Sequence, residues 1–202
     1  MCRAPFTVAA LLLLQPQGIA LENDYVRVTR NSAPCASASA HCGDRVIVAL
    51  SDVELRSAGS PRKLNRGGIA VFPAGESYEA PTTGSYFEVA LKVDHPPLES
   101  PKELIPPEKN AVLYDGARLF IFEEKLAVGD TRPRHSHRPR VVIQLNRTRL
   151  QQWPDGGAEI VREIEPDRVA FNRAVIHKVK NVGDQPLRGI VIELKAARER
   201  PQ

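Results

Sequence analysis

The stretch RVVIQLNRTRL, residues 140–150, repeats the stretch RVIVALSDVEL, residues 45–55, at an offset of 95 positions. Both start with arginine, continue with valine and isoleucine, and reach leucine at their sixth and eleventh positions. Short runs rich in valine and isoleucine are typical of β-strands. Because the run occurs twice, the sequence predicts two similar β-rich units in one chain.

The residues that follow these runs repeat as well. The stretch IAVFPAGESY, residues 69–78, matches VAFNRAVIHK in the second half, which places Phe72 over Phe171 and Tyr78 over His177. Each half holds short strands and turns over about eighty residues, without a convincing amphipathic helix. The predicted fold class is therefore all-β, with two β-barrels or β-sandwiches in tandem.

A proline-rich segment separates the two halves. The stretch DHPPLESPKELIPPEK, residues 94–109, contains five prolines among sixteen residues. Proline lacks the backbone donor that an interior strand or helix needs, so this segment is interpreted as a linker. The predicted division is a signal peptide at 1–20, an N-terminal barrel at 21–93, a linker at 94–110 and a C-terminal barrel at 111–202.

The first twenty residues have the pattern of a secretory signal peptide. One early positive charge, Arg3, precedes an apolar run from Phe6 to Leu14, and small residues lead up to Ala20. This pattern predicts cleavage after Ala20 and export, to the periplasm or outside the cell. The run is shorter than the roughly 20 residues that span a bilayer, so no membrane anchor is expected after cleavage. A buried N-terminal segment is the alternative.

Export would leave Cys35 and Cys42 in the mature chain. An even pair of cysteines in an oxidising compartment can close a small disulfide loop. The alternative is two unpaired buried thiols, and the sequence alone does not choose between them because it does not give the distance between the two side chains.

The net charge of +4 raises the question of nucleic-acid binding. Arginines gather at Arg132, Arg134, Arg138 and Arg140, but they alternate with prolines and histidines and lack the aromatic residues of a stacking platform. A solvated basic rim around a pocket is the preferred interpretation, without a nucleic-acid partner. The sequence also lacks a phosphate loop, a dinucleotide fingerprint and a Ser-His-Asp order. No motif therefore indicates a kinase, a dehydrogenase or a hydrolase.

The stretch GDTRPRHSHRP, residues 129–139, places His135 and His137 one residue apart. In a strand, side chains at i and i+2 lie on the same face, so both imidazoles can reach one ion. His177 follows forty residues later and can approach the pair from another strand. Three neutral imidazoles suit one divalent transition metal: iron, zinc, manganese, nickel or copper. Three histidines on separate surface loops are the alternative.

These residues resemble the two signature motifs of the cupin superfamily. The first motif is matched by Gly129, His135 and His137, and the second by His177 and Asn181. With the repeat, the mature chain resembles a bicupin, two double-stranded β-helix barrels of the jelly-roll type. The resemblance implies that the three histidines are metal ligands, that Gly129 lies in a turn and that Asn181 is a structural residue near the site.

The chain departs from the cupin pattern at the fourth ligand. Where cupins have a glutamate after the second histidine, this sequence has Arg140, Val141 and Val142. An all-histidine site keeps the full charge of a divalent ion, which favours an anionic ligand or hydroxide. Arg140 and Gln144, with Asn181, are predicted to surround the metal or to face a substrate. For Arg140, a surface cation that flanks a strand is the alternative.

The first half lacks the histidines of the second. Tyr78 and Thr82 occupy the positions of the second motif, and the offset of 95 puts Ala40 and Cys42 over the histidine pair, with His41 out of phase. A shift of one residue turns a side chain to the other face of a strand. The N-terminal barrel is therefore expected to lack the metal site and to serve packing or a different ligand.

Cupins with three histidines include thiol and diketone dioxygenases. The resemblance thus implies a metal-dependent dioxygenase acting on a small molecule, with a non-catalytic ligand-binding or structural cupin as the alternative. A cavity lined by polar groups beside the metal would favour the enzyme, and a plugged barrel the structural protein. Because cupins often associate edge to edge, a homodimer is a further expectation.

Overall fold

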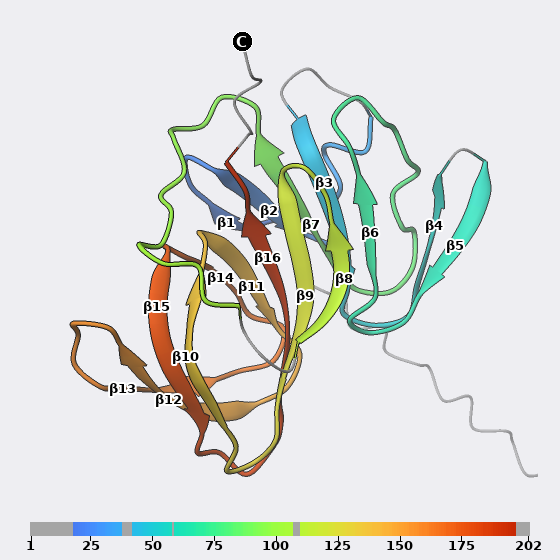
Figure 1. Ribbon diagram of the computed structural model, residues 1–202. Coiled ribbons are helices and arrows are strands. Elements are labelled where there is room, and N and C mark those ends of the chain that lie inside the picture. Colours follow the sequence, from blue (N-terminus) through green and yellow to red (C-terminus); the bar gives the residue numbers. More distant parts are fainter. Residues whose placement is uncertain (1–17, 38–41, 58, 107–109, 197–202) are drawn as a thin grey trace, which may run out of the picture.

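The computed structural model describes four ranges of the chain, 18–37, 42–57, 59–106 and 110–196. Within these ranges all regular secondary structure consists of β-strands, as predicted. Two groups of antiparallel strands lie side by side in Figure 1, one from each half of the sequence. None of the described residues forms a helix that is long and apolar enough to cross a membrane.

The N-terminal barrel consists of a five-stranded sheet in the order β1-β2-β7-β3-β6 and a two-stranded sheet of β4 and β5. Its strands are β1 (Gly18–Glu22), β2 (Val26–Arg30), β3 (Cys42–Ala49), β4 (Val53–Ser57), β5 (Ser60–Leu64), β6 (Ile69–Phe72) and β7 (Tyr86–Lys92).

The C-terminal barrel consists of a five-stranded sheet, β14-β11-β16-β9-β8, and a four-stranded sheet, β10-β15-β12-β13. Its strands are β8 (Asn110–Asp115), β9 (Leu119–Leu126), β10 (Thr131–His137), β11 (Arg140–Gln144), β12 (Thr148–Pro154), β13 (Ile160–Ile164), β14 (Val169–Asn172), β15 (Val175–Asn181) and β16 (Leu187–Leu194).

The predicted signal peptide lies mostly outside the described residues. Its last three residues, Gly18, Ile19 and Ala20, form the start of β1, where Gly18 pairs with Arg30. Cleavage after Ala20 would leave β1 with its last two residues only.

Strand pairing corrects one detail of the repeat. In β3 and β6, Arg45 lies opposite Phe72, whereas in β11 and β14 Arg140 lies opposite Asn172. Phe72 therefore corresponds to Asn172, and the alignment of Phe72 with Phe171 was wrong by one residue. The slip reverses the face of the strand: Phe72 is buried inside the N-terminal barrel, whereas Phe171 packs against the cluster shared by both barrels.

A single cluster of buried apolar side chains joins the two five-stranded sheets. In β3, Val46 and Val48 belong to this cluster while Ile47 faces the interior of its own barrel. In β11, Val141 and Ile143 belong to it in the same way. A sheet buried on both faces needs apolar residues at successive positions, which explains why these runs alternate so little. The buried members are Val26, Val28, Val46, Val48, Leu50, Phe87, Val89, Leu91, Leu119, Ile121, Val141, Ile143, Leu145, Ile190, Ile192 and Leu194.

Polar contacts at the edge of this cluster also join the barrels. Arg66, between β5 and β6, donates to the Leu145 carbonyl at 2.6 Å and to the Asp167 carboxylate at 2.7 Å. Asp167 has a positive φ of 57° and precedes β14. The N-terminal barrel thus holds the turn that leads into a strand of the C-terminal barrel.

The interior of the N-terminal barrel is filled by its own side chains. Tyr78 stacks on Phe72 with 4.1 Å between ring centroids, and its hydroxyl donates to the buried Glu88 carboxylate. Cys35 and Cys42 form a disulfide, and the Cys35 amide donates to Glu88 at 3.3 Å. Tyr78, which the sequence alignment had placed over His177, therefore has a packing role. Ala40 and His41 lie outside the described residues.

Truncation of the shared cluster should destabilise the protein. Ile143 is fully buried in it, so Ile143→Ala is expected to lower the free energy of unfolding by about 2–5 kcal/mol. Val112→Ala, at a side chain 59 % exposed on β8, is the control and should stay within about 0.5 kcal/mol. Denaturant unfolding of both variants checks this, and equal effects would contradict the assigned role of the cluster.

Candidate metal centre

Strands β10 and β15 bring the three histidines together. His135 and His137 both lie in β10, which confirms that this stretch is a strand, and antiparallel pairing places His135 directly opposite His177 in β15. All three side chains are at least 95 % buried. The interpretation of three separate surface loops is therefore wrong.

The three imidazoles converge on one point. The Nε2 atoms of His135 and His137 lie 3.0 Å apart, and those of His177 and His135 lie 3.1 Å apart. Metal–imidazole bonds are about 2.0–2.1 Å long, so two imidazoles bound at right angles to one ion have nitrogens about 3 Å apart. Among the described residues, this is the group of histidine, cysteine and acidic side chains whose donor atoms could hold a metal ion.

Hydrogen bonds on the far side of two rings decide where their lone pairs point. The Nδ1 atom of His135 lies 2.8 Å from the Pro133 carbonyl, and that of His137 lies 2.8 Å from the Glu193 carboxylate. A carbonyl or carboxylate oxygen accepts, so each Nδ1 carries the proton and each Nε2 carries a lone pair. Two lone pairs therefore face each other across 3.0 Å, an arrangement that a cation between them stabilises.

Burial keeps the histidines neutral, which is the form that binds metals. It lowers the pKa of His135 from 6.5 to about 4 and the pKa of His177 to about 3. It also lowers the pKa of His137 well below 6.5, with a further contribution from the positive charge of Arg140. Proton competition with a metal at these nitrogens is accordingly weak near neutral pH.

Glu193 is a residue of the site that sequence reasoning missed. It lies in β16, is 3 % exposed, and accepts from His137 as described above. Burial raises the pKa of its carboxyl group, while Arg138 and Arg140 oppose that rise. The signal in the sequence was one acidic residue in the otherwise apolar run IVIEL. The first cupin motif of this chain lacks its glutamate ligand. Glu193 instead supplies a carboxylate that accepts a hydrogen bond from His137.

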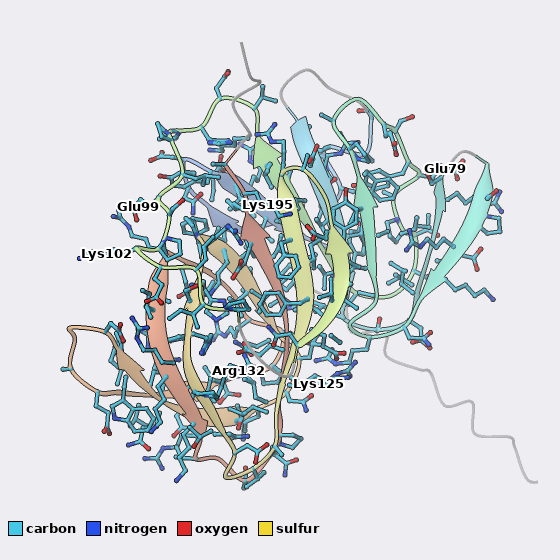
Figure 2. All side chains as sticks on the ribbon, in the orientation of Figure 1. Glu79, Glu99, Lys102, Lys125, Arg132 and Lys195 are labelled. Atoms are coloured by element: carbon cyan, nitrogen blue, oxygen red, sulfur yellow. A yellow bond between two sulfur atoms is a disulfide. The ribbon has the colours of Figure 1, made fainter. Side chains whose placement is uncertain are left out.

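Arg132, which is buried, and Glu124, which is partly buried, form an ion pair near the histidines. Arg132, labelled in Figure 2, is 1 % exposed and donates to the Glu124 carboxylate and to the Lys125 carbonyl. Glu124 also lines the cavity beside the metal centre. Sequence reasoning placed Arg132 in a solvated basic rim, and this placement was wrong because the strand turns its side chain inward.

Of the three residues predicted to surround the metal or to face a substrate, Arg140 and Gln144 line the cavity and Asn181 does not. Arg140 is 8 % exposed and lines the same cavity as His137, so it is no surface cation. Gln144 lines the cavity as well. Asn181 does not line it; its amide donates to the carbonyls of Leu126 and Gln185 and anchors the loop after β15.

The cavity of about 420 Å³ opens beside the histidines. Its size lies in the range of small-molecule sites. Its polar lining comes from seven strands, β9 to β15, and the turn before β14, and it includes His137 and His177. The lining residues are Glu124, His137, Arg140, Val142, Gln144, Leu150, Gln152, Arg162, Glu163, Ile164, Glu165, Arg168, Val169, Ala170, Asn172, His177 and Val179.

Loss of the Glu193 carboxylate should weaken metal binding. Glu193→Ala removes the acceptor that fixes the His137 tautomer, and such losses cost about 10- to 100-fold in metal affinity. Glu193→Gln keeps an acceptor oxygen and should retain most of the affinity. Competition titration with a chromophoric chelator measures both, and wild-type affinity in a folded Glu193→Ala variant would refute the role of this contact.

The stability of the metal-free protein should depend on the histidines. Because the folded pKa values of His135 and His177 lie below 6.5, the unfolded chain binds more protons between pH 6.5 and about 4, and stability falls as pH falls. The raised pKa of Glu193 acts in the opposite direction. Unfolding of chelator-treated protein across this range should therefore show a steeper loss in the parent than in His177→Gln; parallel curves would contradict it.

Comparison with known proteins supports the fold. No family model and no curated protein matches the sequence. Solved structures do match: AerE from Microcystis aeruginosa is 16 % identical, with 91 % of this chain and 95 % of that chain covered and a TM-score of 0.56. A Cupin 2 conserved barrel domain protein from Leptotrichia buccalis is 14 % identical, with 89 % and 88 % covered and a TM-score of 0.53.

The oxalate decarboxylase OxdC from Bacillus subtilis, as a deletion mutant, is also similar. It is 12 % identical, with 86 % of this chain and 69 % of that chain covered, and the TM-score is 0.50. These likenesses extend over both barrels, in agreement with the repeat and with the sheet topology. These likenesses show the fold: two jelly-roll barrels of the cupin type in tandem.

Proposed function

We propose that the protein is an exported cupin that binds one divalent transition metal through His135, His137 and His177, and that it is a metal-dependent dioxygenase acting on a small molecule. The observation that carries the metal site is the pair of Nε2 lone pairs held 3.0 Å apart in a buried cluster. Imidazole ligands accept iron, zinc, manganese, nickel or copper, so the donor set fits any of these ions.

The cavity favours an enzyme over a structural cupin. A barrel without a catalytic role can be plugged, as the interior of the N-terminal barrel is by Tyr78 and Phe72. The C-terminal barrel instead holds a cavity of about 420 Å³ lined by His137 and His177. A bound ion would supply Lewis-acid or dioxygen-activating chemistry there. Glu124 supplies a carboxylate that can accept a proton from a substrate, and Arg140 supplies a fixed positive charge.

Two observations support export. The N-terminal sequence has the pattern of a signal peptide, and the Cys35–Cys42 disulfide is of the kind that persists in oxidising compartments. The mass of the protein recovered from the periplasm or medium would test the cleavage site. The homodimer stays a prediction, which size-exclusion chromatography with light scattering would test.

Metal content is the experiment that tests the proposed site. Elemental mass spectrometry of the purified parent should find about one equivalent of one transition metal, because three imidazoles form one site. His177→Ala should lose most of it, whereas His95→Ala, in the linker, should keep it. Equal and negligible metal in all three proteins would overturn the proposed function, and the identity of a bound metal would direct the search for a substrate.

A further inference from the structure

The cavity beside the histidines contains three arginines without an acidic partner. Arg140 lies deep in it, and its guanidinium donates to the Arg173 carbonyl at 3.0 Å. Arg162 and Arg168 are exposed at its mouth, on β13 and just before β14. The side chains of these two form no ion pair or hydrogen bond within the part of the chain that the structure describes.

The acidic side chains of the same cavity are all paired with other arginines. These pairs are Glu124–Arg132, Glu163–Arg149 at 3.4 Å and Glu165–Arg147 at 3.1 Å. Arg147 and Arg149 do not line the cavity. The local acids are thus neutralised by other partners, and the charge that faces the cavity is positive.

The buried end of the cavity also carries an excess of positive charge. The positive charge of Arg132 is matched by Glu124, and Glu193 in β16 pairs with Arg138 at 3.4 Å, so Arg140 has no acid as an ion-pair partner among the described residues. Imidazoles that bind a metal ion do so in their neutral form and add no charge to the site. If the three histidines hold a divalent ion, as proposed above, its charge of about +2 has no counterpart among these buried groups. A buried positive charge of this size is costly unless an anion accompanies it.

We infer that the ligand of this cavity is a small molecule with two anionic groups, such as a dicarboxylate. One group lies at the buried end beside the histidines and Arg140, and the other lies at the mouth near Arg162 and Arg168. This inference rests on the proposed metal site for its buried end only. The cavity volume of about 420 Å³ accommodates a ligand of a few carbon atoms.

Binding of succinate by isothermal titration calorimetry tests this inference. Metal-loaded protein should bind succinate about tenfold or more tightly than butyrate, which lacks the second carboxylate, or succinamide, which lacks both charges. The double variant Arg162→Gln/Arg168→Gln should lose about five- to tenfold in succinate affinity, because charge pairs at an exposed mouth are partly screened. Its affinity for butyrate should be unchanged.

A charge-matched control separates local from long-range effects. Arg56→Gln/Lys63→Gln removes two positive charges from the β4–β5 hairpin of the other barrel and should leave succinate binding unchanged. Equal affinity for succinate and succinamide would overturn the inference. Wild-type succinate affinity in the variant Arg162→Gln/Arg168→Gln would also overturn it, since the metal ion alone would then account for succinate binding.

Failure of the metal site is distinguishable from failure of this inference. Metal content is measured on the same samples, so a protein with one equivalent of metal and no preference for succinate contradicts the inference alone. The titrations are repeated on chelator-treated protein, where succinate should bind more weakly but still depend on Arg162 and Arg168. No such dependence, in either form of the protein, would refute the role of the mouth arginines.

Discussion

The contact between the two five-stranded sheets is the interaction on which the rest of the structure depends. Strands at the centre of each sheet bury one face in the shared cluster and the other in their own barrel. Because both faces are buried, a shift of one residue would exchange the side chains in the shared cluster with those in the barrel interior, and would force Arg140 into the apolar cluster. Packing of Val141 and Ile143 against the other barrel therefore forces Arg140 and Val142 into the barrel interior, beside the three histidines.

The two barrels use the same positions for different chemistry. Strand pairing makes Arg45 the counterpart of Arg140, and Ala90 the counterpart of Glu193. In the N-terminal barrel, the carboxylate that could orient a histidine is replaced by a methyl group. Its interior instead pairs Tyr78 with Glu88, and burial together with the negative charge of Glu88 raises the pKa of Tyr78 far above 10. That barrel contributes packing area and the Arg66 contact to Asp167.

Much of the candidate site could be predicted because strands have a simple period. The i and i+2 spacing of His135 and His137 needs only that the stretch be extended, and His177 was identified as a histidine on a later strand that matches the second cupin motif. Glu193 and Glu124 were missed, since they reach the site from β16 and β9 through the closure of the barrel, which a linear pattern does not show. The alignment of Phe72 with Phe171 failed because similar side chains suggested a register that burial on both faces forbids.

By itself, the sequence determined the fold class, the tandem repeat and the three histidines. These features depend on local alternation and on residue identity, which a linear pattern carries. The tertiary structure alone decided which side chains share the space around the histidines. It placed Arg140 inside the barrel, paired Glu124 with Arg132, and left Arg162 and Arg168 at the mouth without an acidic partner among the described residues. Such pairings depend on distances between strands far apart in the sequence, and these are set only when both faces of each sheet are packed.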